Sequence, residues 1–160
     1  MSVAGVYHHY PSKEQILVAI LDLTMGEIAW RLEAARDEGQ NAVESFALMV
    51  ESLALFHAVR GDLAFLGASE MRGLGADRGR ITEMRDEVQH VLDRQALEAL
   101  AENPIAGQDA DEVRVATRAI ATMCTSLPSW FRLDGPLTPR EVAARYADYA
   151  LALLERHRSR

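Results

Sequence analysis

The chain has 160 residues, of which 49% are hydrophobic and 26% are charged. This composition is typical of one folded globular domain and excludes an intrinsically disordered chain. The formal net charge of −7 disfavours nucleic acid as a partner for the surface as a whole, so any DNA contact would have to come from a small local patch.

Cysteine content and hydropathy favour a cytoplasmic protein without membrane contact. Cys124 is the single cysteine, which excludes an intramolecular disulfide and a cysteine-based metal cluster. The first residues lack the pattern of a signal peptide, and charges interrupt the apolar stretches before they reach the length of a membrane span.

Helix-start signals divide the first half of the chain. Ser12 followed by Gln15 forms a capping box, and apolar residues then recur at helical spacing until Gly39. Asn41 begins a second predicted helix, which we expect to end at Gly61. A shorter apolar segment covers residues 62–71, and a glycine-rich loop follows it.

The second half contains three further predicted helices. One begins near Arg80 and stops near Asn103, just before a proline. The next starts at a cap on Asp109 and is kinked or ended by Pro128. The last begins with a Thr138 cap. Apolar residues rarely alternate with polar ones, so the sequence predicts an all-α helical bundle of about six helices.

No pattern of reactive residues indicates an enzyme. Glu87 and His90 have the Glu-x-x-His spacing of di-iron bundles, but that site needs a second such pair and two further glutamates. Cys124 lies among apolar residues of a predicted helix, where a thiol behaves as a small hydrophobic group. We therefore expect no catalytic residues, no metal site and no cofactor.

Methionines and aromatic residues are spread over several predicted helices. Such residues form ordinary cores, but they also line adaptable cavities in helical bundles, and the sequence does not separate the two. His57 lies on an otherwise apolar helix face. It is either a histidine at the edge of the core with one hydrogen bond or a group that recognises a polar atom of a ligand.

The stretch VYHHYPSKE, residues 6–14, closely resembles the end of the recognition helix in the TetR/AcrR family of bacterial transcriptional regulators. The stretch SWFRLDGPLTPREVAARYADYALALL, residues 129–154, is similar to family members that regulate lipid catabolism and respond to acyl-CoA thioesters. The resemblance implies a helix-turn-helix head that binds DNA and a helical body that binds a ligand and dimerises.

The resemblance assigns residues 1–11 to a remnant of the DNA-binding head and residues 12–160 to the ligand-binding and dimerisation domain. Most of the head that the family pattern requires would precede Ser2, and we expect operator DNA to bind only when that head is present. The positions that match DNA-contacting residues of the family are Ser2, Val3, Ala4, Gly5, Tyr7, His9 and Lys13.

Helical spacing and the resemblance together predict an effector pocket inside the body. Its expected walls are Phe46, Met49, Leu53, Met84, Met123, Leu127 and Trp130, with His57 or Arg85 as a polar anchor. An acyl-CoA or another long apolar anion is the leading effector class, and a small aromatic or drug-like molecule is the second.

The sequence thus predicts a homodimeric, ligand-responsive transcriptional regulator of the TetR type, a repressor by analogy with the family. The alternatives are a small-molecule-binding or interaction domain that does not act on DNA, and a small helical enzyme. A filled core without a cavity is also compatible with the predicted wall residues.

Overall fold

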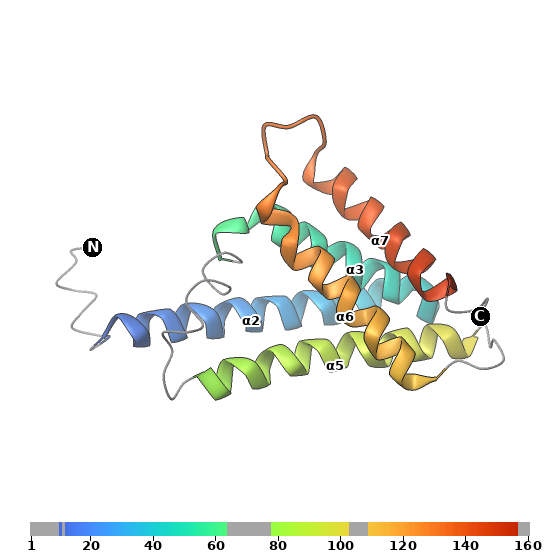
Figure 1. Cartoon of the computed structure of the whole chain (residues 1–160), viewed down its shortest axis with the longest axis horizontal. Helices are drawn as coiled ribbons and strands as arrows, with labels where there is room; N and C mark the ends of the chain where they lie inside the picture. The colour runs from blue at the N-terminus through green and yellow to red at the C-terminus, as the bar shows by residue number, and fades with distance from the viewer. Residues whose placement is uncertain (1–9, 11, 64–77, 103–108, 157–160) are drawn as a thin grey trace.

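A computed structural model describes residues 10, 12–63, 78–102 and 109–156 of the chain. Within these ranges the regular structure is helical throughout, which confirms the all-α prediction. The elements are α2 (Lys13–Glu38), α3 (Ala42–Val59), α5 (Arg78–Glu102), α6 (Ala110–Ser126), the 3₁₀ turn η3 (Leu127–Ser129) and α7 (Pro139–Arg156) (Figure 1).

The helices begin where capping side chains satisfy their free N–H groups. The Gln15 N–H donates to Ser12 Oγ over 3.2 Å, and the Glu44 N–H donates to Asn41 Oδ1 over 2.9 Å. At α7 the box is reciprocal, because the Thr138 N–H also donates to Glu141 Oε2 over 2.8 Å. The backbone hydrogen bonds to Glu141 hold the pKa of this carboxyl below its usual value.

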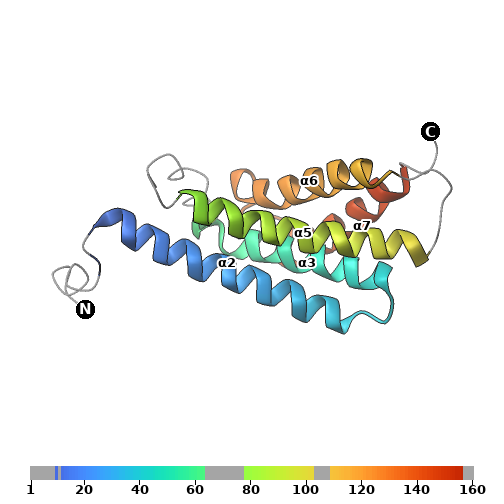
Figure 2. The same ribbon diagram turned by 90° about the horizontal axis from the view of Figure 1, so that it is seen from below.

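α3 is the central helix of the bundle and contacts α2, α5, α6 and α7. Figure 2 shows α2 along one side of α3, with α6 and α7 toward the other side and α5 running beside both α3 and α6. α3 is long and apolar enough to cross a membrane by length and composition, but half of it is buried inside the bundle. Its apolar character follows from this central position, so it is only weak evidence for a membrane span.

Two separate clusters of buried apolar residues hold the fold together. The main core is built on α3 and receives residues from α2, α5, α6 and α7. A smaller cluster joins the first half of α2 to the start of α5, and it consists of Leu17, Val18, Leu21 and Ile81, with Met84 packed against it. The space between these two clusters is therefore the natural place for an internal cavity.

Some helix ends differ from the sequence prediction. α3 ends at Val59 rather than at Gly61, with the Arg60 N–H bonded to the Phe56 carbonyl over 2.8 Å. α6 ends at Ser126, and Pro128 lies in the 3₁₀ turn, as expected of a residue that cannot continue a helix. Most of the short segment predicted at residues 62–71 falls outside the described residues.

Candidate functional site

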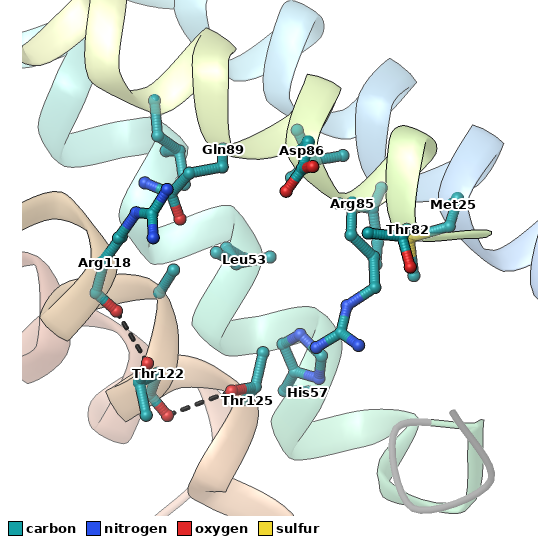
Figure 3. Close-up of a pocket in the computed structure, with 14 residues that line it drawn as sticks. Met25, Leu53, His57, Thr82, Arg85, Asp86, Gln89, Arg118, Thr122 and Thr125 are labelled. Atoms are coloured by element: carbon teal, nitrogen blue, oxygen red, sulfur yellow. Dashed lines mark hydrogen bonds between the residues drawn. The ribbon is translucent and has the colours of Figure 1, made fainter. Parts of the chain in front are cut away.

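A pocket of about 350 Å³ opens between α2, α3, α5 and α6. Figure 3 shows the side chains of these four helices converging on it. Its apolar wall comes from all four helices and consists of Met25, Ile28, Leu53, Val88, Leu92 and Ala121. An apolar cavity with a few convergent polar groups is the usual form of a small-molecule site.

The polar wall of the pocket is formed mainly by α5 and α6. It contains Thr82, Arg85, Asp86, Gln89, Arg118, Thr122 and Thr125. The threonine hydroxyls on α6 already donate to their own helix: Thr122 Oγ1 to the Arg118 carbonyl over 2.7 Å, and Thr125 Oγ1 to the Thr122 carbonyl over 3.1 Å. These hydroxyl oxygens can therefore still accept a hydrogen bond from a ligand.

A second, smaller chamber of about 140 Å³ adjoins this pocket. The two share five lining residues, namely Met25, Ile28, His57, Arg85 and Thr125. The remaining wall of the smaller chamber is mostly apolar and consists of Leu21, Thr24, Phe56, Leu63 and Ile81. We call the larger space the outer chamber and the smaller one the inner chamber.

His57 lies where the two chambers meet. Its side chain belongs to α3 and its residue is only 5% exposed, yet neither Nδ1 nor Nε2 has a hydrogen-bond partner among the described residues. The Phe56 ring contacts it edge-on, with the ring centroids 5.4 Å apart. Burial lowers the pKa of His57 to about 4, so its imidazole is neutral at pH 7.

Two guanidinium groups give the outer chamber positive charge. Arg85 comes from α5 and Arg118 from α6, and neither forms an ion pair with another described residue. In Figure 3 the Arg85 side chain extends from α5 toward His57. Asp86 is the carboxylate on the same wall. The pocket thus combines a buried neutral imidazole with exposed cations that favour an anionic group.

Next to this wall, a second polar group is hydrogen-bonded within the chain. Gln89 Nε2 donates to Asp93 Oδ1 over 2.7 Å and to Thr117 Oγ1 over 3.1 Å, and Thr117 Oγ1 donates to Asp93 Oδ1. Asp93 and Thr117 are buried and join α5 to α6. Gln89 belongs both to this triad and to the outer chamber.

The structure brings three of the predicted effector-binding residues together at the pocket: Leu53, His57 and Arg85. Phe46, Met49 and Leu127 are fully buried in the main core, and Met123 packs against that core. Met84 packs against the smaller cluster, and Trp130 is half exposed beyond the end of α6. Ligand binding by any of these residues stays a prediction.

Of the polar wall, the sequence pattern predicts only Arg85. Thr82, Asp86 and Gln89 follow one another at spacings of four and three residues, as do Arg118, Thr122 and Thr125. This spacing places each set on one helix face. The signal was present, but a polar stripe is usually a solvated surface, whereas here the two stripes face each other across the outer chamber.

The other reactive residues do not form a site in the described part of the chain. Burial raises the pKa of the Cys124 thiol to about 12, so the thiol is un-ionised and packs in the main core. Among the described residues, no group of three histidine, cysteine or carboxylate side chains could hold a metal ion. His90 and Glu87 are both exposed on α5.

Of the residues that match DNA-contacting positions, only Lys13 lies in the described part of the chain. It is the first residue of α2 and is exposed. The other six predicted positions, within residues 2–9, lie outside the described residues.

The architecture is a helical bundle with a partly polar pocket between four of its helices. The family model described as "Tetracyclin repressor-like, C-terminal domain" matches residues 39–154, so the chain belongs to the TetR family. A search of curated proteins gave no match.

Solved structures of TetR-family regulators share the fold. PfmR from Thermus thermophilus is 27% identical with a TM-score of 0.82, and the match covers 95% of this chain and 82% of that one. A tetR-family regulatory protein from Rhodococcus is 26% identical with a TM-score of 0.83, covering 96% and 80%. Both resemblances confirm the predicted fold and family.

AibR in complex with isovaleryl coenzyme A and operator DNA is a more distant neighbour. It is 23% identical with a TM-score of 0.75, and the match covers 96% of this chain and 80% of AibR. At this identity the likeness shows the fold alone.

Proposed function

We propose that this chain is the effector-binding body of a TetR-type transcriptional repressor, and that the effector binds in the outer and inner chambers. One observation carries the proposal: a buried histidine with two ring nitrogens unpaired among the described residues faces a pocket. Unpaired buried polar atoms cost free energy, and they persist where a ligand completes them.

We propose an acyl-CoA or a similar apolar anion as the effector. The apolar wall suits an acyl chain, and the Arg85 and Arg118 guanidiniums suit phosphate groups at the mouth. The similarity of residues 129–154 to regulators that respond to acyl-CoA thioesters points the same way, and the distant neighbour AibR was solved with isovaleryl coenzyme A.

Isothermal titration calorimetry with hexanoyl-CoA tests this function. We expect saturable binding, and Arg118→Glu should weaken it by about tenfold or more, since it replaces a charge-assisted hydrogen-bond donor with a like charge. Arg114→Glu is the matched control, because Arg114 is exposed on the same helix and lies outside both chambers. No binding by any acyl-CoA, or equal effects of the two variants, would contradict the proposed site.

We also propose that two copies pair through α6 and α7. Val115 on α6, Trp130 and Leu133 after it, and Tyr149 on α7 are large, exposed apolar side chains. An interface of this kind is self-complementary in a two-fold dimer. Sedimentation equilibrium should give twice the chain mass of 17.7 kDa. Val115→Glu combined with Tyr149→Glu should yield monomers, while Leu23→Glu, on an exposed α2 position, should not.

The proposed response to the effector is loss of operator binding by the protein that carries the complete DNA-binding head. Effector binding between α2 and α5 would shift the start of α2, to which the head is attached in the family. A cytoplasmic location follows from the proposed role at the operator. An electrophoretic shift of operator DNA that hexanoyl-CoA reverses would support this; DNA binding that no effector alters would contradict it.

A further inference from the structure

The two chambers differ in the polarity of their walls. Both chambers are lined by His57 and Arg85, but only the outer chamber contains Thr82, Asp86, Gln89, Arg118 and Thr122. The inner chamber instead adds Leu21, Phe56, Leu63 and Ile81, with Thr24 beside them. A molecule that occupies both chambers therefore contacts a polar wall in one, the imidazole between them, and a mainly apolar wall in the other.

The His57 ring creates a specific chemical demand at this boundary. A neutral imidazole has one N–H donor and one acceptor nitrogen, and both are buried without a partner among the described residues. The described neighbours do not meet this demand, because the contact with Phe56 is apolar and neither Arg85 nor Thr125, which line the same space, hydrogen-bonds to the ring. An ordered water or an atom of a ligand can supply a partner that the described residues do not.

We propose that His57 selects an effector with an uncharged carbonyl-type group, which binds the imidazole at the boundary while a short apolar chain beyond it fills the inner chamber. This inference rests on the proposed function and assigns the part of the ligand that each chamber holds. The charged part of the effector stays in the outer chamber beside Arg85 and Arg118.

The group at His57 is uncharged because the boundary disfavours ions. The same burial that lowers the pKa of His57 would penalise a carboxylate placed against it. Arg85 lines both chambers and Arg118 only the outer one, and both are exposed, so a charged group paired with either guanidinium keeps its contact with solvent. A thioester, ester or amide carbonyl can accept the imidazole N–H without carrying charge into the bundle.

The volume of the inner chamber limits the length of the apolar chain. A dry cavity of about 150 Å³ lined by leucine, isoleucine and phenylalanine accommodates benzene, a molecule of six heavy atoms. The inner chamber, of about 140 Å³, has leucine, isoleucine and phenylalanine in its wall beside Thr24, His57, Arg85 and Thr125. The chain beyond the carbonyl should therefore hold about six carbons at most, and longer chains would have to leave the chamber or displace its walls.

The carbonyl assignment is tested by comparing hexanoyl-CoA with S-hexyl-CoA, a thioether that has the same chain length and lacks the carbonyl. Calorimetric titration of the wild-type chain should show the thioester binding about tenfold more tightly, the usual worth of one buried hydrogen bond. In His57→Phe the two ligands should bind equally. In His57→Gln the preference should partly return, because the amide N–H can reach the same acceptor.

His90→Phe is the matched control, because His90 is exposed on α5 and lines neither chamber. It should keep the wild-type preference for the thioester. Circular dichroism melts confirm that each variant is folded, and the comparison of two ligands on the wild-type chain needs no variant at all.

Chain length gives an independent test. Affinity should rise from butanoyl-CoA to hexanoyl-CoA and stop rising by octanoyl-CoA. A continued rise through dodecanoyl-CoA would overturn the assignment of the chain to the inner chamber.

Equal binding of thioester and thioether by the wild-type chain would mean that water satisfies His57, and would overturn the inference while leaving the proposed function intact. Absence of binding by every acyl-CoA and thioether would overturn the proposed effector class and this inference together.

Discussion

Two buried polar groups on neighbouring helices of this bundle differ in one respect. The Gln89–Asp93–Thr117 triad is joined by hydrogen bonds within the chain, whereas neither ring nitrogen of His57 has a partner among the described residues. The triad joins α5 to α6, and His57 faces an open space between four helices. The comparison distinguishes a polar group that links two helices from one that is available, among the described residues, to a ligand.

The largest expected effect is a loss of stability in acid that the wild type shows and His57→Phe does not. The pKa of His57 is about 4 in the folded chain and about 6.5 when unfolded, so the unfolded state binds more protons between these values. Titration of His57 therefore leaves the free energy of unfolding unchanged above pH 6.5 and lowers it by about 3 kcal/mol as the pH falls to 4. His57→Phe lacks this loss.

Urea unfolding of the wild type and His57→Phe at pH 7 and pH 4 measures the effect. Carboxyl groups titrate in both proteins, so the difference between their losses of stability from pH 7 to pH 4 is due to His57. Equal losses of stability in the two proteins would show that His57 is solvated rather than buried without a partner.

Removing a member of the triad should come next in size. Thr117→Val keeps the side-chain shape but deprives the buried Asp93 carboxylate of a donor, and we expect a loss of about 2 kcal/mol in the free energy of unfolding. Thr122→Val on the same helix removes an exposed hydroxyl that bonds to its own helix, and should cost less than about 0.5 kcal/mol. Similar costs for the two would contradict the structural role of the triad.

Within the triad, the effects of Gln89 and Thr117 should not add. Gln89→Leu removes both amide donors, and each residue bonds the other as well as Asp93. A double-mutant cycle of Gln89→Leu and Thr117→Val should give a coupling energy of about 1.5 kcal/mol from denaturant unfolding. Additivity within about 0.3 kcal/mol would mean that the two residues act independently.

The smallest effect should have the opposite sign. His57→Phe at pH 7 replaces an unpaired buried imidazole with an apolar ring, and should raise the free energy of unfolding by about 1 kcal/mol. Thermal unfolding of the variant and of His90→Phe would measure it. A loss of several kcal/mol in His57→Phe alone would show that His57 has a structural partner within the chain.

Much of the fold was predictable because helix signals are local. The caps at Ser12, Asn41 and Thr138, and the end of α2 at Gly39, depend on residues within four positions of each other. The sequence pattern predicts that α3 ends at Gly61, two residues late, because the chain leaves the helix at Arg60.

The pocket was less predictable because it depends on which helix faces meet. Apolar periodicity identified Leu53, but it equally selected Phe46 and Met49, which the structure places in the solid core. Helical spacing cannot distinguish a wall from a core, since both lie on the inward face of a helix. The polar residues on α5 and α6 became pocket walls only through the packing of these two helices.

The most direct test of effector binding at His57 is the ring ¹⁵N NMR spectrum of this residue, assigned with His57→Phe, before and after saturation with hexanoyl-CoA. At pH 7 we expect a neutral imidazole whose ring nitrogen shift changes on binding, while the shifts of His90 stay unchanged. Unchanged His57 nitrogen shifts at a ligand concentration that calorimetry shows to be saturating would contradict the claim that the effector supplies its missing partner.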